Sequence, residues 1–476
     1  MSIGLARVTI NAPQRRVDVA LPEHVPLAEL LPEVLRHAGE GLADDGERHG
    51  GWVLRRTDGA PLLTEQGLLP QGVRDGEVLH LVPARAQWPE LEYDDVVEAI
   101  ADGARRRGAA WGAPATRAAT LVGSGVLLTV GLLAVLHGGP SWGIGAFVAL
   151  GVAVLLALAG VVASRGYGDG PAGTALGGYA LPYAFAGGAL LVASGDPVGV
   201  LGPLRWMGAP ELLVGSVALL LVAILGLVGT ATGLRVFAAG VTVGLLGAIT
   251  ALAGFFLTAA GAAAVLMSVL VCGIGVLPLL AIRFGKLPMP PITLPTGAEG
   301  AEGFTAAGVG SPESARERPE RGRVFAAVAR TEELLTGMLT GHAVLAGAAA
   351  LLLVTDDGFA GRLLAAVSAG GLLLRSRLFV TLRQRVPLVA AGLVGFAVLG
   401  ASLAGRVDHA GLLGLTAGGL ILALVTVAAG ATYSRRPPSP YLGRAADLFD
   451  TVMVVSVVPV ACAVLGLYAR ARGLLG

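Results

Sequence analysis

The stretch DGEVLHLVPARAQW, from Asp75 to Trp88, separates two kinds of sequence in this chain. Its first half alternates apolar and polar residues through Leu79, His80, Leu81 and Val82, which predicts the last strand of a small domain. Its second half is polar, and after Arg117 long apolar runs dominate the sequence. The chain is therefore expected to carry a β-rich head domain, a linker and a membrane domain.

Residues 1–83 contain a compact series of short elements before this point. The segments ARVTI and RRVDVAL predict two strands around a turn at residues 11–14. VPLAELLPEVLRHAGEG predicts a helix that ends at Gly39, with Pro32 as either a kink or a later start. GWVLRRTDGAPL predicts a strand with an Asp-Gly turn, and GEVLHLV the last strand. This order resembles a β-grasp fold, specifically a ubiquitin-like domain.

The end of this domain excludes conjugation. A ubiquitin that can be conjugated ends in a free Gly-Gly, whereas here Val82 continues into Pro83, Ala84 and Arg85. We therefore expect a docking module whose exposed sheet face contacts a partner. The candidate docking residues are Arg55, Arg56, His80 and Val82, and the alternative for each is an ordinary surface or half-buried strand residue.

The composition indicates a membrane protein. The chain has 476 residues, of which 54% are hydrophobic and 14% charged, against about 25% charged in soluble domains. The mean hydropathy is +0.74, and the 72 glycines suit closely packed lipid-buried helices. The net charge of +1 gives no reason to expect a nucleic-acid partner. The first residues have no apolar signal-peptide core, so the head domain is expected in the cytoplasm.

Residues 84–117 are expected to form a linker. WPELEYDDVVEAIADGARRRG predicts a short amphipathic helix with an acidic start and a basic end, which suits the helix dipole. Two interpretations are open: a solvated spacer, or a helix that docks at the membrane surface. In the second, Arg105, Arg106 and Arg107 meet anionic lipid head groups.

The apolar runs predict about eleven transmembrane helices, six in residues 118–282 and five in residues 335–476. A membrane span needs about 20 residues. The predicted spans are 118–137, 143–163, 174–194, 211–231, 234–256, 259–282, 335–355, 358–374, 386–405, 410–431 and 449–469. The weakest is 358–374, because arginines at both ends shorten its uncharged part. Residues 283–334, rich in Pro, Gly and charge, are expected to form a cytoplasmic loop.

Arginine placement favours eleven spans over ten. Cytoplasmic loops carry excess Lys and Arg. With eleven spans and a cytoplasmic N-terminus, seven arginines of the second half lie inside: Arg375, Arg377, Arg383, Arg385, Arg435, Arg436 and Arg444. Outside lie Arg406, Arg470 and Arg472, apart from Arg362 at a span end. The C-terminus is then extracytoplasmic, despite its basic sequence.

No pattern in the sequence indicates catalysis. A pump or ion-coupled transporter places ionisable groups near the middle of the membrane. Here the ionisable residues fall at predicted span ends or first turns: His137, Glu211, His342, Asp356, Asp357, Arg362, Asp408, His409, Asp447 and Asp450. No phosphate-binding loop, metal motif or nucleophile motif is present. We therefore expect no enzyme activity, no cofactor and no metal, and energy that comes from a partner.

The whole arrangement resembles the EccD family, the multispanning membrane component of type VII (ESX) secretion systems. The resemblance rests on the ubiquitin-like head, the acidic EYDD at residues 92–95, the arginine cluster and the six-plus-five split. It implies an inner-membrane complex with EccB-, EccC- and EccE-like subunits. In that complex EccC is the ATPase, EccD-like chains pair as a homodimer among membrane lipids, and small helical-hairpin proteins are exported.

One alternative is a secondary transporter of the major-facilitator type with a cytoplasmic regulatory head. Its two-halves organisation fits the central loop. However, the first cytoplasmic loop, SRGYGDGPAGT, lacks that family's Gly-x-x-x-Asp-Arg-x-Gly-Arg-Arg pattern. A membrane-bound enzyme has no constellation of residues to support it.

Overall fold

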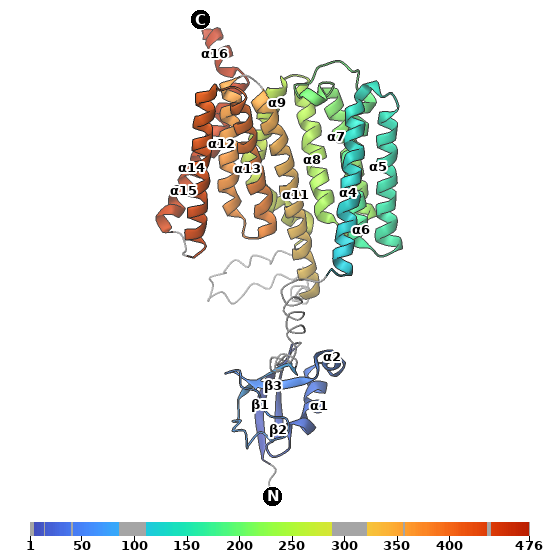
Figure 1. Ribbon diagram of the computed structural model, residues 1–476, viewed down its shortest axis with the longest axis vertical. Coiled ribbons are helices and arrows are strands. Elements are labelled where there is room, and N and C mark those ends of the chain that lie inside the picture. The colour runs from blue at the N-terminus through green and yellow to red at the C-terminus, as the bar shows by residue number, and fades with distance from the viewer. Residues whose placement is uncertain are drawn as a thin grey trace, which may run out of the picture. The chain divides into compact units, whose positions relative to one another are not determined.

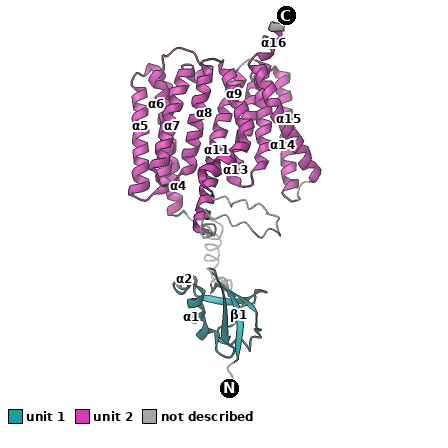
Figure 2. Ribbon diagram, turned by 180° about the vertical axis from the view of Figure 1, so that it is seen from behind, with its two compact units in different colours: residues 1–112 teal, residues 113–476 magenta. Residues whose placement is uncertain are grey.

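The computed structural model describes residues 4–13, 15–39, 41–84, 111–287, 321–355, 358–435 and 439–475. The chain divides into two compact units, Met1–Gly112 and Ala113–Gly476 (Figure 2). Three predicted features lie outside the described residues. They are the amphipathic helix with Arg105, Arg106 and Arg107, most of the 283–334 loop, and Arg436.

Unit 1 is a four-stranded mixed sheet with helices on one side. The strands β1 (Leu5–Asn11), β2 (Arg16–Pro22), β3 (Trp52–Arg56) and β4 (Val78–Pro83) are ordered β2-β1-β4-β3. The central pair β1 and β4 is parallel, while β1–β2 and β3–β4 are antiparallel. The helices are α1 (Leu27–Ala38) and α2 (Leu42–His49). The predicted ubiquitin-like fold is confirmed.

Alternation along the strands builds the core of unit 1. Val8, Ile10, Leu54, Leu79 and Leu81 are buried on one sheet face, because successive strand residues point to opposite faces. Leu27 and Val34 of α1 complete the same cluster.

The turns and helices of unit 1 agree only in part with the prediction from the sequence. Pro32 lies inside α1 and does not end it. The predicted Asp-Gly turn is present, with Gly59 at a φ of +90° and its N–H donating to the Arg56 carbonyl. Helix α2 was not predicted, because its sequence LADDGERH is mostly polar and buries little beyond Leu42.

Unit 2 is a bundle of long helices (Figure 1). Its first half contains α4 (Ala113–Gly138), α5 (Gly145–Val161), α6 (Gly170–Val192), α7 (Ala209–Gly229), α8 (Leu234–Gly254), α9 (Ala259–Gly273) and α10 (Leu277–Gly285). Its second half contains α11 (Arg321–Thr355), α12 (Phe359–Arg375), α13 (Leu382–Ala404), α14 (His409–Tyr433), α15 (Pro440–Val464) and α16 (Leu467–Leu475). Some of these helices are joined by short helical turns: η2 (Gly139–Ser141), η3 (Val162–Gly166), η4 (Gly202–Leu204), η5 (Ile274–Val276) and η6 (Ser376–Leu378). Helices α9 and α10 form one continuous span.

Ten helical segments among the described residues are long and apolar enough to cross a membrane. The eleventh predicted span is α12, whose 17 residues lie at the lower limit for a crossing. Ser402, near the end of α13, donates its hydroxyl to the Val354 carbonyl at the end of α11. Helices α11 and α13 therefore run in the same direction, and α12 returns between them. The start of α4 and helix α16 lie at opposite ends of the unit (Figure 1), as an odd number of passes requires.

Two predicted boundaries in the second half were wrong. The last span was predicted at 449–469, but α15 starts at Pro440 and ends at Val464. Ser439 caps the start of α15 by accepting the Leu442 N–H, and Pro440 suits the first helical position. After the end of α15, Gly466 at a φ of +68° separates this helix from α16. The span predicted at 335–355 belongs to helix α11, which is 35 residues long and begins at Arg321, inside the segment expected to be a loop.

Glycines let the helices of unit 2 cross closely. A Cβ on Gly240 or Gly244 of α8 would lie 2.9 Å or less from atoms of Leu181, Ala223 or Leu220. The pair Gly337 and Gly341 of α11 meets α8 in the same way. Such contacts supply the packing that replaces hydrophobic driving force in lipid.

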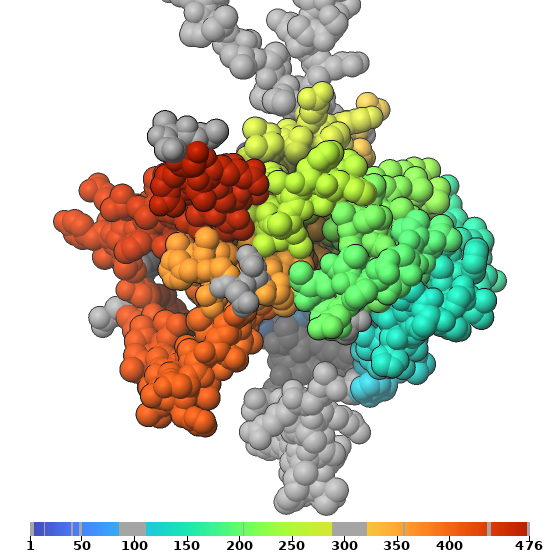
Figure 3. Space-filling model, turned by 90° about the horizontal axis from the view of Figure 1, so that it is seen from above, coloured from blue at the N-terminus to red at the C-terminus, as the bar shows by residue number. Residues whose placement is uncertain are grey.

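One helix at the edge of unit 2 is uncovered. Helices α14 and α15 lie at one edge of the bundle, and α4 and α5 at the other (Figure 1; Figure 3). No residue of α14 is buried, and a Cβ on Gly414 or Gly418 would meet nothing within 4 Å. The Gly414/Gly418 spacing is therefore unused within the chain.

Candidate functional site

The strand register brings a row of polar side chains across the outer face of the sheet in unit 1. Asn11 pairs with Arg16 on one side and with His80 on the other, and His80 pairs with Arg55. The row Arg16–Asn11–His80–Arg55 therefore spans all four strands. The Asn11 Nδ2 and His80 Nδ1 atoms lie 3.4 Å apart, so the two central side chains are in contact.

Three of the four predicted docking residues share this outer face. Leu79 and Leu81 are buried in the core, so the alternating residues His80 and Val82 face outward. Arg55 lies opposite His80, and Val53 lies opposite Val82. All four are half-buried. On this face the polar row with Arg55 and His80 lies beside the apolar pair Val53 and Val82.

Arg56 does not belong to this face. It pairs with the buried Leu79, and its guanidinium donates to the Gln71 carbonyl at 2.5 Å. Its Nε atom lies 3.3 Å from the Glu77 Oε1 atom. Arg56 thus links the segment before β4 to strand β3, and its contacts are structural.

Sequence reasoning missed Asn11, Arg16 and Val53 of the outer face. Period-2 alternation assigns residues to faces within one strand, but only the pairing register places residues of different strands in one row. The polar Arg16 and Asn11 border the predicted turn, which is the signal that could have included them.

Among the described residues of unit 2, one ion pair between helices is largely buried. Arg375 of α12 and Asp450 of α15 keep only 16% and 25% of their side-chain exposure, with the Nε and Oδ1 atoms 3.6 Å apart. Arg375 Nη1 also donates to the Val271 carbonyl at 2.7 Å in the last turn of α9. Because α15 starts at Pro440, Asp450 lies well inside the helix and not at its end as predicted. The arginine balances the carboxylate charge and joins three helices.

Glu211 and His342 are two further buried ionisable groups in the described part of unit 2. Glu211 lies in the first turn of α7, as predicted, and accepts the Gly208 N–H. His342 is only 6% exposed and its Nδ1 lies 3.1 Å from the Met338 carbonyl. It lies well inside the long α11, not near its start as predicted. No group of three His, Cys, Asp or Glu suited to a metal occurs in the described residues.

Both units match models of known protein families. A family model described as the EccD-like transmembrane domain matches residues 116–474. A model described as the WXG100 protein secretion system (Wss) protein YukD matches residues 5–81.

Individual proteins match over all or part of the chain. The ESX-4 secretion system protein eccD4 of Mycobacterium tuberculosis (strain ATCC 25618 / H37Rv) is 28% identical, covering 99% of this chain and 98% of that protein. The ESX-1 secretion system protein EccD1 of the same strain is 32% identical over 105 residues, which is 20% of each chain.

Two solved structures share the fold. A chain titled as protomer 1 of the ESX-3 core complex matches 98% of this chain and 100% of its own length, with a TM-score of 0.57 and 21% identity. A chain of the MycP5-free ESX-5 inner membrane complex, State II, matches 90% of this chain and 99% of its own length, with a TM-score of 0.53 and 21% identity.

Proposed function

Because this chain belongs to the EccD family, we propose that it is a scaffold subunit of a type VII protein secretion complex in the inner membrane. It builds the membrane architecture of the complex and docks an EccC-like ATPase, which supplies the energy for export of small helical-hairpin proteins. EccB- and EccE-like subunits and a second copy of the chain complete the assembly.

The observation that carries this proposal is that, in the described part of the chain, each unit leaves one face uncovered. In unit 1 it is the outer sheet face with the row Arg16–Asn11–His80–Arg55. In unit 2 it is helix α14, which has no buried residue. A helix with so little contact within its own chain gains stability from a neighbouring subunit, and its Gly414/Gly418 spacing suits a close helix crossing with the second copy.

The arginines of unit 2 support the proposed orientation. Arg165, Arg375, Arg377 and Arg383 lie at helix ends on the side where α4 starts. The positive-inside rule makes this side cytoplasmic, with α16 outside. A reporter enzyme that is active only outside the cytoplasm, fused after α16, should be active, and an inactive folded fusion would reverse the orientation.

Gentle detergent extraction of the full chain with an affinity handle tests the proposed function. An FtsK-like ATPase and a single-span subunit should co-purify in fixed stoichiometry with at least two copies of the chain. A lone monomer that binds a small solute would contradict the proposal and favour the transporter.

One observation favours a secondary transporter, namely that His342 is an ionisable group buried in α11. A proton relay needs further titratable groups within hydrogen-bond reach. Within the described part of the chain, the contact recorded for the His342 ring is the backbone carbonyl of Met338. This contact lies within α11, and we therefore assign the imidazole a role in helix packing.

Replacement of this side chain separates the two functions. We expect His342→Asn, which keeps a donor for the Met338 carbonyl, to export substrate proteins at the wild-type rate. Secretion of the hairpin substrates into the medium measures this. Loss of transport in a variant that still assembles would contradict the scaffold role.

A further inference from the structure

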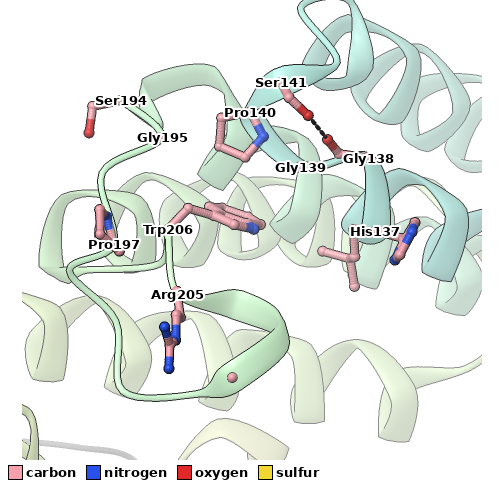
Figure 4. A pocket seen from close by; sticks show the side chains of 12 residues that line it. His137, Gly138, Gly139, Pro140, Ser141, Ser194, Gly195, Pro197, Arg205 and Trp206 are labelled. Carbon is pink, nitrogen blue, oxygen red and sulfur yellow. Dashed lines mark hydrogen bonds between the residues drawn. The ribbon is translucent and has the colours of Figure 1, made fainter.

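At the end of unit 2 that carries α16, two connections border an open cavity of about 460 Å³. One is the turn from α4 through η2 (Gly139–Ser141) to α5, and the other is the connection from α6 to α7. Its polar lining includes His137, Ser141, Ser194, Arg205 and Trp206, and none of the lining residues is acidic. Figure 4 shows the Trp206 indole extending across the cavity toward Gly139, with Arg205 and His137 on opposite sides of it in this view.

Trp206 supplies a buried donor without an acceptor. The residue is 8% exposed, and its Nε1 atom has no hydrogen-bond partner among the described residues. A buried N–H without a partner costs free energy comparable to a lost hydrogen bond. The ring is held by packing against the cluster around Val135, Ala146 and Tyr183, so the donor is fixed in place.

The walls of the cavity are themselves fixed by backbone geometry. Gly139 adopts a φ of +53°, and a Cβ there would lie 3.4 Å from Trp206 Nε1. The Gly199 N–H donates to the Arg205 carbonyl at 2.5 Å, which fixes the loop beside the cavity. Ser141 donates its hydroxyl to the Gly138 carbonyl at 2.7 Å.

The charged groups at the mouth are available to a ligand. Arg205 and His137 are exposed, and in the described part of the chain neither side chain takes part in a hydrogen bond or ion pair. Asp196, in the same connection, is exposed and does not line the cavity. Donors and positive charge without a carboxylate suit an anion with several acceptor oxygens.

The surroundings identify the source of that anion. Exposed apolar side chains flank both connections: Trp142 is 39% exposed, Ile144 60% and Val198 61%. Tryptophan is enriched at the membrane–water interface, and apolar groups next to a cationic cavity at this depth match a head group with its acyl chains. We propose that this cavity binds the phosphate of an anionic phospholipid, with Arg205 and the Trp206 N–H as its donors.

Native mass spectrometry of the delipidated full chain tests this site, with dioleoylphosphatidylglycerol as the probe and dioleoylglycerol as the phosphate-free control lipid. Wild type should bind phosphatidylglycerol and not dioleoylglycerol. Arg205→Gln should weaken binding by about tenfold or more, because a charge-assisted hydrogen bond is lost. Trp206→Phe, which keeps most of the ring and removes the N–H, should weaken it by roughly three- to tenfold.

A matched control is Arg470→Gln, which removes an arginine from α16 at the same end of the unit but outside the cavity. It should bind phosphatidylglycerol like wild type. Equal weakening in Arg470→Gln and Arg205→Gln, or unchanged binding in Arg205→Gln and Trp206→Phe, would overturn the site. Binding of inorganic phosphate as tight as that of the lipid would overturn the assignment to a lipid.

Discussion

Replacement of Gly341 by leucine is expected to destabilise unit 2 strongly. A Cβ at this position would lie 2.7 Å from the Thr242 Cβ atom and 2.8 Å from the Ala239 carbonyl oxygen of α8. Neither atom is the end of a flexible side chain, so α8 and α11 must move apart along their whole crossing. Overpacking of a dense core costs about 1–3 kcal/mol, and the leucine side chain places this variant at or above the upper value. Thermal unfolding and gel filtration of the detergent-purified chain measure the effect.

Gly414→Leu is the matched control for this variant. It is the same change in a long helix, but a Cβ at Gly414 meets nothing within 4 Å. The purified single chain should therefore keep its wild-type unfolding temperature, while pairing with the second copy should weaken. Equal stability of Gly341→Leu and Gly414→Leu would show that the α8–α11 crossing is not as close as described.

The second large effect is expected at the ion pair between α12 and α15. Arg375→Ala leaves Asp450 without its cation and the Val271 carbonyl without its donor. Breaking a buried pair costs about 3–5 kcal/mol, and the remaining exposure of the two side chains favours the lower value. The unfolding temperature of the purified chain should fall clearly, and proteolysis at the ends of α12 should increase.

The double variant Arg375→Met/Asp450→Leu distinguishes charge balance from packing. Replacement of a buried ion pair by apolar residues of similar volume is often neutral, so the double variant should recover most of the lost stability. A double-mutant cycle with the single variants gives the coupling energy. Additive losses in the cycle would mean that the two charges do not interact.

The periodicity of the sequence was enough to predict the class of both units. Alternation in ARVTI and GEVLHLV predicts a sheet with one buried face, and the long apolar runs predict a bundle of membrane-spanning helices. It could not determine where α15 starts, because Ser439 and Pro440 lie far outside the apolar run and act through capping geometry. For the same reason Asp450 was placed at a helix end.

The candidate sites depend on contacts between elements and could be predicted only in part. His80 and Arg55 were identified because they occupy outward positions in their own strands. Arg56 was assigned to the same face because the alternation of WVLRR is ambiguous, and only the pairing with Leu79 shows its true direction. The Trp206 cavity joins residues about 70 positions apart, which no local pattern reports.

The central proposal is that unit 1 docks an EccC-like ATPase, and the retention of that ATPase on variants of the outer sheet face tests it most directly. The double variant Arg55→Glu/His80→Glu reverses the charge of the row, and Glu29→Arg on α1 is a charge-changing control at an exposed helix position. The affinity-purified charge-reversed chain should keep its membrane partners. The amount of ATPase that co-purifies with it should fall by about tenfold or more, because like charges across an interface repel. The Glu29→Arg chain should retain the ATPase. Wild-type amounts of ATPase on a folded Arg55→Glu/His80→Glu chain would contradict the account.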